Sequence, residues 1–178
     1  MRVISGRFGG RRLQAPPGSN TRPTGDRVRE ALFSMLGTEV DGARVLDLFA
    51  GSGALGLESL SRGAANATFV DSASAAVRAI RANLDALGLD ADVRRMDALA
   101  FLRAASRGGP HYDLVFLDPP YRSATRLGPG LSSGLPAVLA AGATVVCESA
   151  RRDPLNLDLP LRDERRYGDT LIRIHDCL

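Results

Sequence analysis

Residues 45–53 constrain the fold more than any other stretch, because they combine a buried strand with a glycine loop. An apolar run over 45–50, broken only by Asp47, leads directly into Gly51-Ser52-Gly53, and a helix is predicted over 54–62. Glycine lets the backbone approach a ligand where a Cβ would collide, and a helix N-terminus favours polar groups. This stretch therefore predicts a parallel α/β sheet with a nucleotide-binding turn.

The rest of the chain repeats the strand–helix unit without a linker that would separate two large domains. A strand over 67–70 ends at Asp71, an amphipathic helix follows over 73–87, and a short strand near Val93 comes next. Residues 143–147 continue the sheet, and the alternation over 171–174 after the turn at 167–169 predicts an antiparallel hairpin at one edge. The length of 178 residues, 44% of them hydrophobic, suits one compact α/β domain.

Asp118-Pro119-Pro120-Tyr121 follows another apolar run, 114–117, and indicates a chemistry. An exocyclic aromatic amine shares its lone pair with the ring and is a poor nucleophile. The Asp118 carboxylate and the Pro119 carbonyl, side by side, could each accept one N–H and draw the nitrogen toward tetrahedral geometry. The prolines fix the turn, and Tyr121 offers a face for a stacked base. The tetrapeptide favours amine methylation, although alone it is equally compatible with a simple Pro-Pro turn.

The glycine loop also matches a second class of enzyme. Gly51, Gly53 and Gly56 fit the GxGxxG pattern of dinucleotide-dependent oxidoreductases, and Asp71 lies 18 residues beyond Gly53, where a ribose-binding acid is expected. Two features distinguish the classes: Asp47, which could neutralise the amino group or sulfonium of S-adenosylmethionine, and the turn that begins at Asp118, which hydride transfer does not require. The alternative role of Asp47 is to cap N–H groups of its own loop.

Asp97 allows two compatible interpretations. It could contact the amino group of an adenine ring, because it follows the strand near Val93, and it could equally cap the helix predicted over 98–105.

Positive charge is concentrated at the start of the chain. Residues 1–30 contain seven arginines against Asp26 and Glu30, a balance of +5, whereas the whole chain carries +3. Residues 2–13 could form a small hairpin around Gly9-Gly10. We therefore expect residues 1–20 to be a basic hairpin extension that contacts RNA phosphates, ahead of a catalytic domain over 21–178.

Two further segments carry structural expectations. A helix is predicted over 26–36, with Val28, Ala31, Leu32 and Met35 packed inward. Arg22, Arg27 and Arg29 are expected to face outward or toward the site. The Gly-, Ser- and Pro-rich stretch 122–136 could be a mobile lid over the target base or an ordinary connection.

Metal, thiol and membrane chemistry are not indicated. Cys147, Cys177, His111 and His175 are far apart, so the sequence has neither a zinc-ligand spacing nor a CxxC pair. It also has no signal-peptide pattern and no run of about 18 apolar residues. We expect a cytoplasmic protein with reduced cysteines, no bound metal and no membrane association.

Three stretches in this order resemble one family. They are residues 21–36, the Asp47-Leu-Phe-Ala-Gly-Ser-Gly loop and the Asp118-Pro-Pro-Tyr turn, and the chain is similar to the RsmD family of bacterial 16S rRNA guanine-N2 methyltransferases. The resemblance implies a Rossmann-like class I S-adenosylmethionine-dependent methyltransferase fold. Its sheet would have seven mostly parallel strands, an antiparallel C-terminal hairpin and a small basic N-terminal β-hairpin extension.

The resemblance also implies roles for individual residues. The cofactor S-adenosylmethionine would be held by Asp47, Phe49, Ala50, Gly51, Ser52 and Gly53 at its methionine part, by Asp71 and Ser72 at the ribose, and by Asp97 and Ala98 at the adenine. The catalytic turn would be Asp118, Pro119, Pro120 and Tyr121. RNA contacts would come from Arg2, Arg7, Arg11, Arg12, Arg22, Thr24 and Arg27. The partner would be 16S rRNA within an assembled or assembling small subunit, and the enzyme a monomer.

The choice of guanine N2 rests on the resemblance alone. Paired acceptors detect only an amino group, so adenine N6 or cytosine N4 of another RNA or of DNA stays open. A NAD-dependent oxidoreductase and a non-catalytic RNA-binding protein are the alternatives from other classes.

Overall fold

The structure, a computed structural model, describes residues 1–17, 25–120 and 124–177. Within this part of the chain the helices are α1 (Asp26–Leu36), α2 (Ala54–Ser61), α3 (Ser74–Leu87), α4 (Ala98–Ala105) and α5 (Ala124–Gly134), and the short 3-10 turns are η1 (Gly6–Phe8), η2 (Gly37–Val40) and η3 (Leu135–Ala137). The strands are β1 (Arg44–Asp47), β2 (Asn66–Asp71), β3 (Asp92–Arg95), β4 (Tyr112–Leu117), β5 (Leu139–Ala150), β6 (Leu161–Tyr167) and β7 (Thr170–Asp176).

The described strands form one seven-stranded sheet in the order β3-β2-β1-β4-β5-β7-β6. Strands β1 to β5 are parallel, whereas β7 runs antiparallel to β5 and pairs with β6 in a hairpin. The strand order reverses at β1, which lies between β2 and β4, so a crevice is expected at the carboxyl ends of β1 and β4. The predicted parallel sheet with an antiparallel C-terminal hairpin is confirmed.

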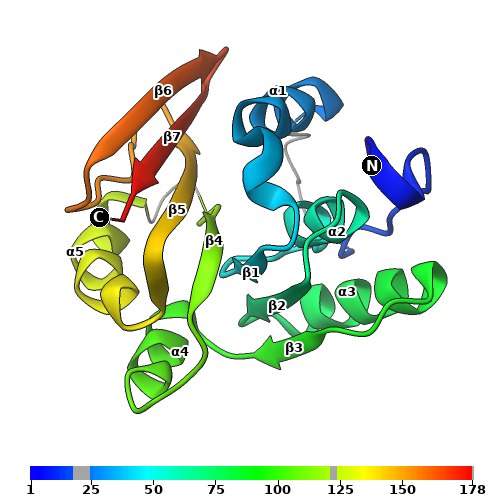
Figure 1. Cartoon of the computed structure of the whole chain (residues 1–178), viewed down its shortest axis with the longest axis horizontal. Helices are drawn as coiled ribbons and strands as arrows, with labels where there is room; N and C mark the ends of the chain where they lie inside the picture. Colours follow the sequence, from blue (N-terminus) through cyan, green and yellow to red (C-terminus); the bar gives the residue numbers. More distant parts are fainter. Residues whose placement is uncertain (18–24, 121–123, 178) are drawn as a thin grey trace.

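The helices cover both faces of the sheet (Figure 1). Helices α1, α2 and α3 lie on one side, and α4 and α5 lie on the other. Successive residues of β1 belong to the two cores: Val45 is part of the first core, which also contains Leu32 and Phe69, whereas Leu46 is part of the second core, which also contains Leu102. Burial on both faces is why the central strands read as continuous apolar runs.

The N-terminal segment packs on the sheet's first core. Its side chains Val3, Phe8 and Leu13 are buried there, and Arg2 and Arg12 form an isolated antiparallel bridge that closes the loop. The expected turn around Gly9-Gly10 thus exists, but its interior is apolar. The expected boundary at residue 20 lies outside the described residues.

The expected inward face of α1 is confirmed only in part. Helix α1 has its predicted bounds and Leu32 is buried, and Val28 and Met35 pack against the core, but these two and Ala31 are only partly buried. The other buried positions are Arg29, Phe33 and Leu36. The face is rotated because Phe33 packs against Phe116 of the sheet, with the ring centroids 5.8 Å apart.

The stretch expected to be a lid or a connection is instead helical over 124–134. Its glycines permit close packing, since a Cβ at Gly128 would lie 2.5 Å from the Asn156 carbonyl oxygen and one at Gly134 would lie 2.9 Å from Leu102. Leu131 is fully buried, so this part of the stretch is not a lid. Residues 122 and 123 lie outside the described residues.

No helix in the described ranges is long and apolar enough to cross a membrane. The same ranges contain no group of three or more His, Cys, Asp or Glu side chains that could hold a metal ion.

Candidate active site

The candidate site lies at the carboxyl ends of β1 and β4. These strands are parallel neighbours with Asp47 opposite Phe116, and the Leu48 amide donates to the Phe116 carbonyl at 3.1 Å. This register brings Asp118, two residues beyond Phe116, to the glycine loop that follows β1. The cavity there is lined by Met1, Arg29, Asp47, Phe49, Ala50, Gly51, Ser52, Ala54, Leu55, Asp118 and Glu148.

Asp47 is almost completely buried at the base of this cavity, with 1% of its surface exposed. Its Oδ2 accepts a hydrogen bond from the Gly56 amide at 3.1 Å, whereas Oδ1 is buried without a partner in the described part of the chain. Burial raises the pKa of the Asp47 carboxyl to about 7; the Gly56 hydrogen bond lowers it in part, and the Asp71 carboxylate raises it further. The capping role is therefore real, but it uses only one oxygen, and Oδ1 is free to accept from a cationic ligand.

The glycine loop is shaped for a close backbone approach. Gly51 has φ +56° and Gly53, the residue before α2, has φ +80°, both in the left-handed region that favours glycine. A Cβ at Gly51 would meet no atom within 4 Å, so its solvent side is open. A Cβ at Gly56 would instead lie 2.3 Å from the Phe69 ring. Gly56 thus allows α2 to pack tightly on β2, while Gly51 leaves room for a ligand.

The acids predicted for the adenosine half lie at the carboxyl ends of neighbouring strands: Asp71 is the last residue of β2, and Asp97 comes two residues after β3. Asp71 accepts hydrogen bonds from the amides of Gly51 at 2.9 Å and Ala73 at 2.8 Å, and Ser72 next to it is exposed. Asp97 caps α4 by accepting from the Ala100 amide at 3.0 Å. Ala98 is buried behind it. The capping interpretation of Asp97 is confirmed, and Asp71 also fixes the glycine loop.

The proposed catalytic turn begins at the cavity wall. Asp118 is half-buried and lines the cavity, Pro119 is buried and Pro120 is exposed. Tyr121 lies outside the described residues. The structure thus brings Asp47 and Asp118, 71 positions apart in the sequence, to one cavity.

Four cavity residues were not anticipated: Met1, Ala54, Leu55 and Glu148. Arg29, which was expected to face outward or toward the site, lines the cavity as well. Arg29 and Glu148 are 2% and 4% exposed, respectively. Burial lowers the pKa of Arg29, and the carboxylates of Glu58, Asp26 and Glu148 oppose this shift. A signal existed in the sequence for Glu148 and Arg29, because Glu148 directly follows the apolar run 143–147, now part of β5, and Arg29 lies one helical turn before Leu32 and Phe33. A charge within an apolar pattern often marks a site.

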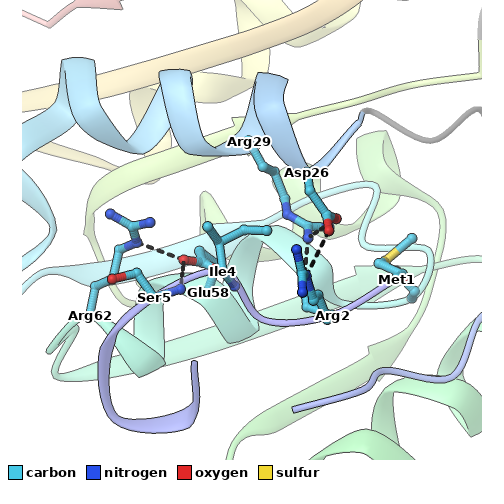
Figure 2. A network of polar contacts seen from close by, with 9 residues as sticks. Met1, Arg2, Ile4, Ser5, Asp26, Arg29, Glu58 and Arg62 are labelled. Atoms are coloured by element: carbon cyan, nitrogen blue, oxygen red, sulfur yellow. Dashed lines mark hydrogen bonds and ion pairs between the residues drawn. The ribbon is translucent and has the colours of Figure 1, made fainter. Parts of the chain in front are cut away.

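The N-terminal segment is joined to α2 through its backbone (Figure 2). Glu58, which is fully buried, accepts hydrogen bonds from the amides of Ile4 at 2.7 Å and Ser5 at 3.0 Å, and Arg62 donates to the same carboxylate at 2.7 Å. Asn83 of α3 bonds both the amide and the carbonyl of Gln14, and it also donates to the Ser52 carbonyl at 2.9 Å. The segment is thereby linked to the glycine loop itself.

The arginines predicted to contact RNA differ in their surroundings. Arg2 pairs with Asp26 at 2.9 Å, Arg7 lies over the Phe8 ring, and Arg11 donates to the Ala86 carbonyl at 3.0 Å. Arg12 and Arg27 are exposed. Arg22 and Thr24 lie outside the described residues.

Comparison with known proteins places the chain in a family. The family model described as conserved hypothetical protein 95 matches residues 1–176. Ribosomal RNA small subunit methyltransferase D of Escherichia coli (strain K12) is 46% identical over 123 residues, which cover 68% of this chain and 61% of that protein. The chain belongs to the RsmD family. YlbH of Bacillus subtilis (strain 168), whose name assigns it provisionally to the rRNA methyltransferases, is 49% identical over 124 residues, 68% of this chain and 67% of that protein. The aligned part thus spans about two thirds of these relatives.

Solved structures agree over nearly the whole RsmD-family chain. The hypothetical protein TTHA0928 of Thermus thermophilus covers 99% of it, and is itself covered to 99%, with a TM-score of 0.85 and 30% identity. A 16S rRNA N2 G1207 methyltransferase of T. thermophilus, solved with S-adenosylmethionine and guanosine, superposes with a TM-score of 0.70 at 22% identity over 92% of this chain and 45% of that one. The fold is that of the class I S-adenosylmethionine-dependent methyltransferases.

Proposed function

We propose that this protein transfers a methyl group from S-adenosylmethionine to the exocyclic N2 amine of a guanine in 16S rRNA. One observation carries the proposal: the parallel register of β1 and β4 places Asp118 on the cavity that Asp47 and the glycine loop also line. A hydride-transfer enzyme requires the glycine loop but not this second acid. The names of the family's curated relatives support rRNA as the substrate.

The residues present fit S-adenosylmethionine. Asp47 Oδ1 is a buried acceptor without a partner in the described chain, which suits the ligand's ammonium group. The open side of Gly51 suits the approach of the ligand to the backbone, and Asp71 and Asp97 suit the ribose and adenine. When bound, S-adenosylmethionine supplies an electrophilic methyl group.

The chain's own contribution is to orient the amine. Asp118 and the Pro119 carbonyl would each accept one N–H of the base, which directs the nitrogen lone pair outward. After transfer, the nitrogen releases one proton to Asp118 or to water. Tyr121 is proposed to stack on the flipped base. No stronger base is needed, because the methylated amine is acidic before it loses this proton.

The proposed setting is the cytoplasm, where a monomer would act on 16S rRNA in an assembled or assembling small subunit. The exposed Arg12 and Arg27, together with Arg2, Arg7 and Arg11, are the proposed phosphate contacts. Arg22 and Thr24 belong to the same proposal.

The test is transfer of labelled methyl from S-adenosylmethionine to unmodified small subunits, naked 16S rRNA and 23S rRNA, followed by digestion to nucleosides. N2-methylguanosine from the small-subunit substrates alone is expected. Asp118→Asn keeps the size of the side chain but removes its charge, so it should abolish transfer and leave cofactor binding intact. Labelled N6-methyladenosine or N4-methylcytidine would change the assigned base. NAD binding by calorimetry without any methyl transfer would favour the oxidoreductase.

A further inference from the structure

Arg29 reaches the cavity from α1 and is held there by one end of its guanidinium. Its Nη2 donates to the Arg2 carbonyl and to Asp26 Oδ1, the latter at 3.2 Å (Figure 2). Its Nε is buried and has no partner among the described residues. A buried guanidinium with an unused N–H is costly, since removing a charged donor from water without a hydrogen bond is unfavourable.

This unused donor and the unused acceptor of Asp47 belong to the same cavity. Across the described chain, three buried side-chain nitrogen or oxygen atoms have no partner: Arg29 Nε, Asp47 Oδ1 and His175 Nε2. The first two belong to residues that line the cavity, and they have opposite character, a cationic donor and a carboxylate acceptor. A ligand that satisfies both presents an acceptor to Arg29 and a donor to Asp47, as the carboxylate and ammonium groups of an α-amino acid do.

We propose that Arg29 binds the α-carboxylate of the methionine part of S-adenosylmethionine, while Asp47 accepts from its ammonium group. The assignment rests on the proposed function and adds a binding residue to it. The planar guanidinium suits a carboxylate, because its N–H groups match the two oxygens. The contacts of Nη2 keep the side chain in position before the ligand arrives, which lowers the entropic cost of binding.

A purely structural role for Arg29 is the competing explanation. The carboxylates of Glu58, Asp26 and Glu148 act on Arg29 electrostatically, so the guanidinium could serve only to balance their charge. The two explanations differ in one respect. A charge-balancing arginine affects every ligand of the cavity through folding, whereas a carboxylate-binding arginine affects only ligands that carry a carboxylate.

The experiment measures binding of two ligands by calorimetry. S-adenosylhomocysteine carries the amino acid group, and methylthioadenosine has the same adenosine and sulfur without it. Arg29→Ala and the milder Arg29→Lys are compared with wild type, and Arg81→Ala, an exposed position on α3, is the matched control. We expect Arg29→Ala to bind S-adenosylhomocysteine about 10- to 100-fold more weakly, and methylthioadenosine as wild type does. The affinity of Arg29→Lys for S-adenosylhomocysteine should lie between those of wild type and Arg29→Ala.

The outcomes separate the two levels of inference. If Arg29→Ala weakens both ligands equally, or neither, the carboxylate assignment is overturned while cofactor binding stands. If wild type binds methylthioadenosine but prefers S-adenosylhomocysteine by less than about twofold, the cavity has no amino-acid subsite and the assignment is likewise overturned. If wild type binds neither ligand, the proposed function itself fails. Binding of methylthioadenosine by Arg29→Lys also reports that the variant is folded.

Discussion

Asp47→Asn should make the ligand-free protein more stable relative to wild type as the pH rises. In the folded chain burial raises the pKa of the Asp47 carboxyl to about 7, whereas in the unfolded chain it ionises near its ordinary value of 3.8. Asparagine has nearly the same shape, can still accept from the Gly56 amide, and never ionises. The substitution therefore removes the cost of burying a carboxylate at neutral pH.

The sign and size follow from proton linkage. Below pH 4 the carboxyl is protonated in both states and imposes no penalty. Between about 4 and 7 the unfolded chain has lost the proton and the folded chain has kept it, so the free energy of unfolding falls by about 1.4 kcal/mol per pH unit. Above pH 7 the penalty is constant at on the order of 4 kcal/mol. The asparagine NH2, buried without a partner, costs about 1–3 kcal/mol at every pH.

The pH dependence is therefore the discriminating quantity. Urea unfolding of wild type and Asp47→Asn is measured at pH 5 and pH 8 without ligand, and the difference in the free energy of unfolding should grow by about 2–3 kcal/mol in favour of the variant. Asp90→Asn, at an exposed position, is the control and should show no such growth. The same Asp47→Asn protein should bind S-adenosylhomocysteine poorly. Equal differences at the two pH values would refute the assignment of a raised pKa to Asp47.

Three other outcomes are expected. Gly56→Ala forces a Cβ to within 2.3 Å of the Phe69 ring. The free energy of unfolding, measured by urea denaturation, should therefore fall by about 1–3 kcal/mol. An unchanged urea midpoint would contradict the packing of α2 on β2. Glu58→Ala leaves two backbone amides and Arg62 without their acceptor, which should cost about 3–5 kcal/mol and make the N-terminal segment accessible to protease. Arg12→Ala should weaken binding to 16S rRNA and reduce the slope of log affinity against log salt by about 1, without changing S-adenosylhomocysteine affinity; an unchanged slope would remove Arg12 from the RNA surface.

Local patterns were enough to predict most elements. The strand–glycine–helix pattern over 45–62, the stripe on α3 ending at Gly88 and the alternation over 171–174 each report short-range geometry, and each element is present. Helix α5 was missed because its glycines indicate a loop when read alone. They are compatible with a helix only because Leu102 and the Asn156 carbonyl lie where a Cβ would be.

The site could be predicted only in part, because some of its features depend on packing between segments that are distant in the sequence. Asp47 and Asp118 follow apolar runs, so their positions at strand ends could be read from the sequence. Arg29 was expected to face outward or toward the site, but its burial could not be predicted, because that burial depends on the rotation of α1 that Phe33 imposes by packing on Phe116. The raised pKa of Asp47 likewise depends on burial from several segments, which no spacing encodes. The roles of Asp71, Asp97 and the RNA-contacting arginines stay predictions.

Besides its buried apolar side chains, the N-terminal segment is held by hydrogen bonds to its main chain. Glu58 and Asn83 bond peptide groups of Ile4, Ser5 and Gln14, and Ser61 accepts from the Phe8 amide. Peptide groups are the same in nearly every residue, so these hydrogen bonds do not depend on the exposed side chains between the anchor points. The surface that they form can therefore acquire new target preferences by substitution, while the methyl-transfer cavity beside it keeps its shape. If the proposed RNA contacts hold, the exposed positions of this segment, and not the buried Val3 and Phe8, are where substrate recognition can be redesigned independently of catalysis.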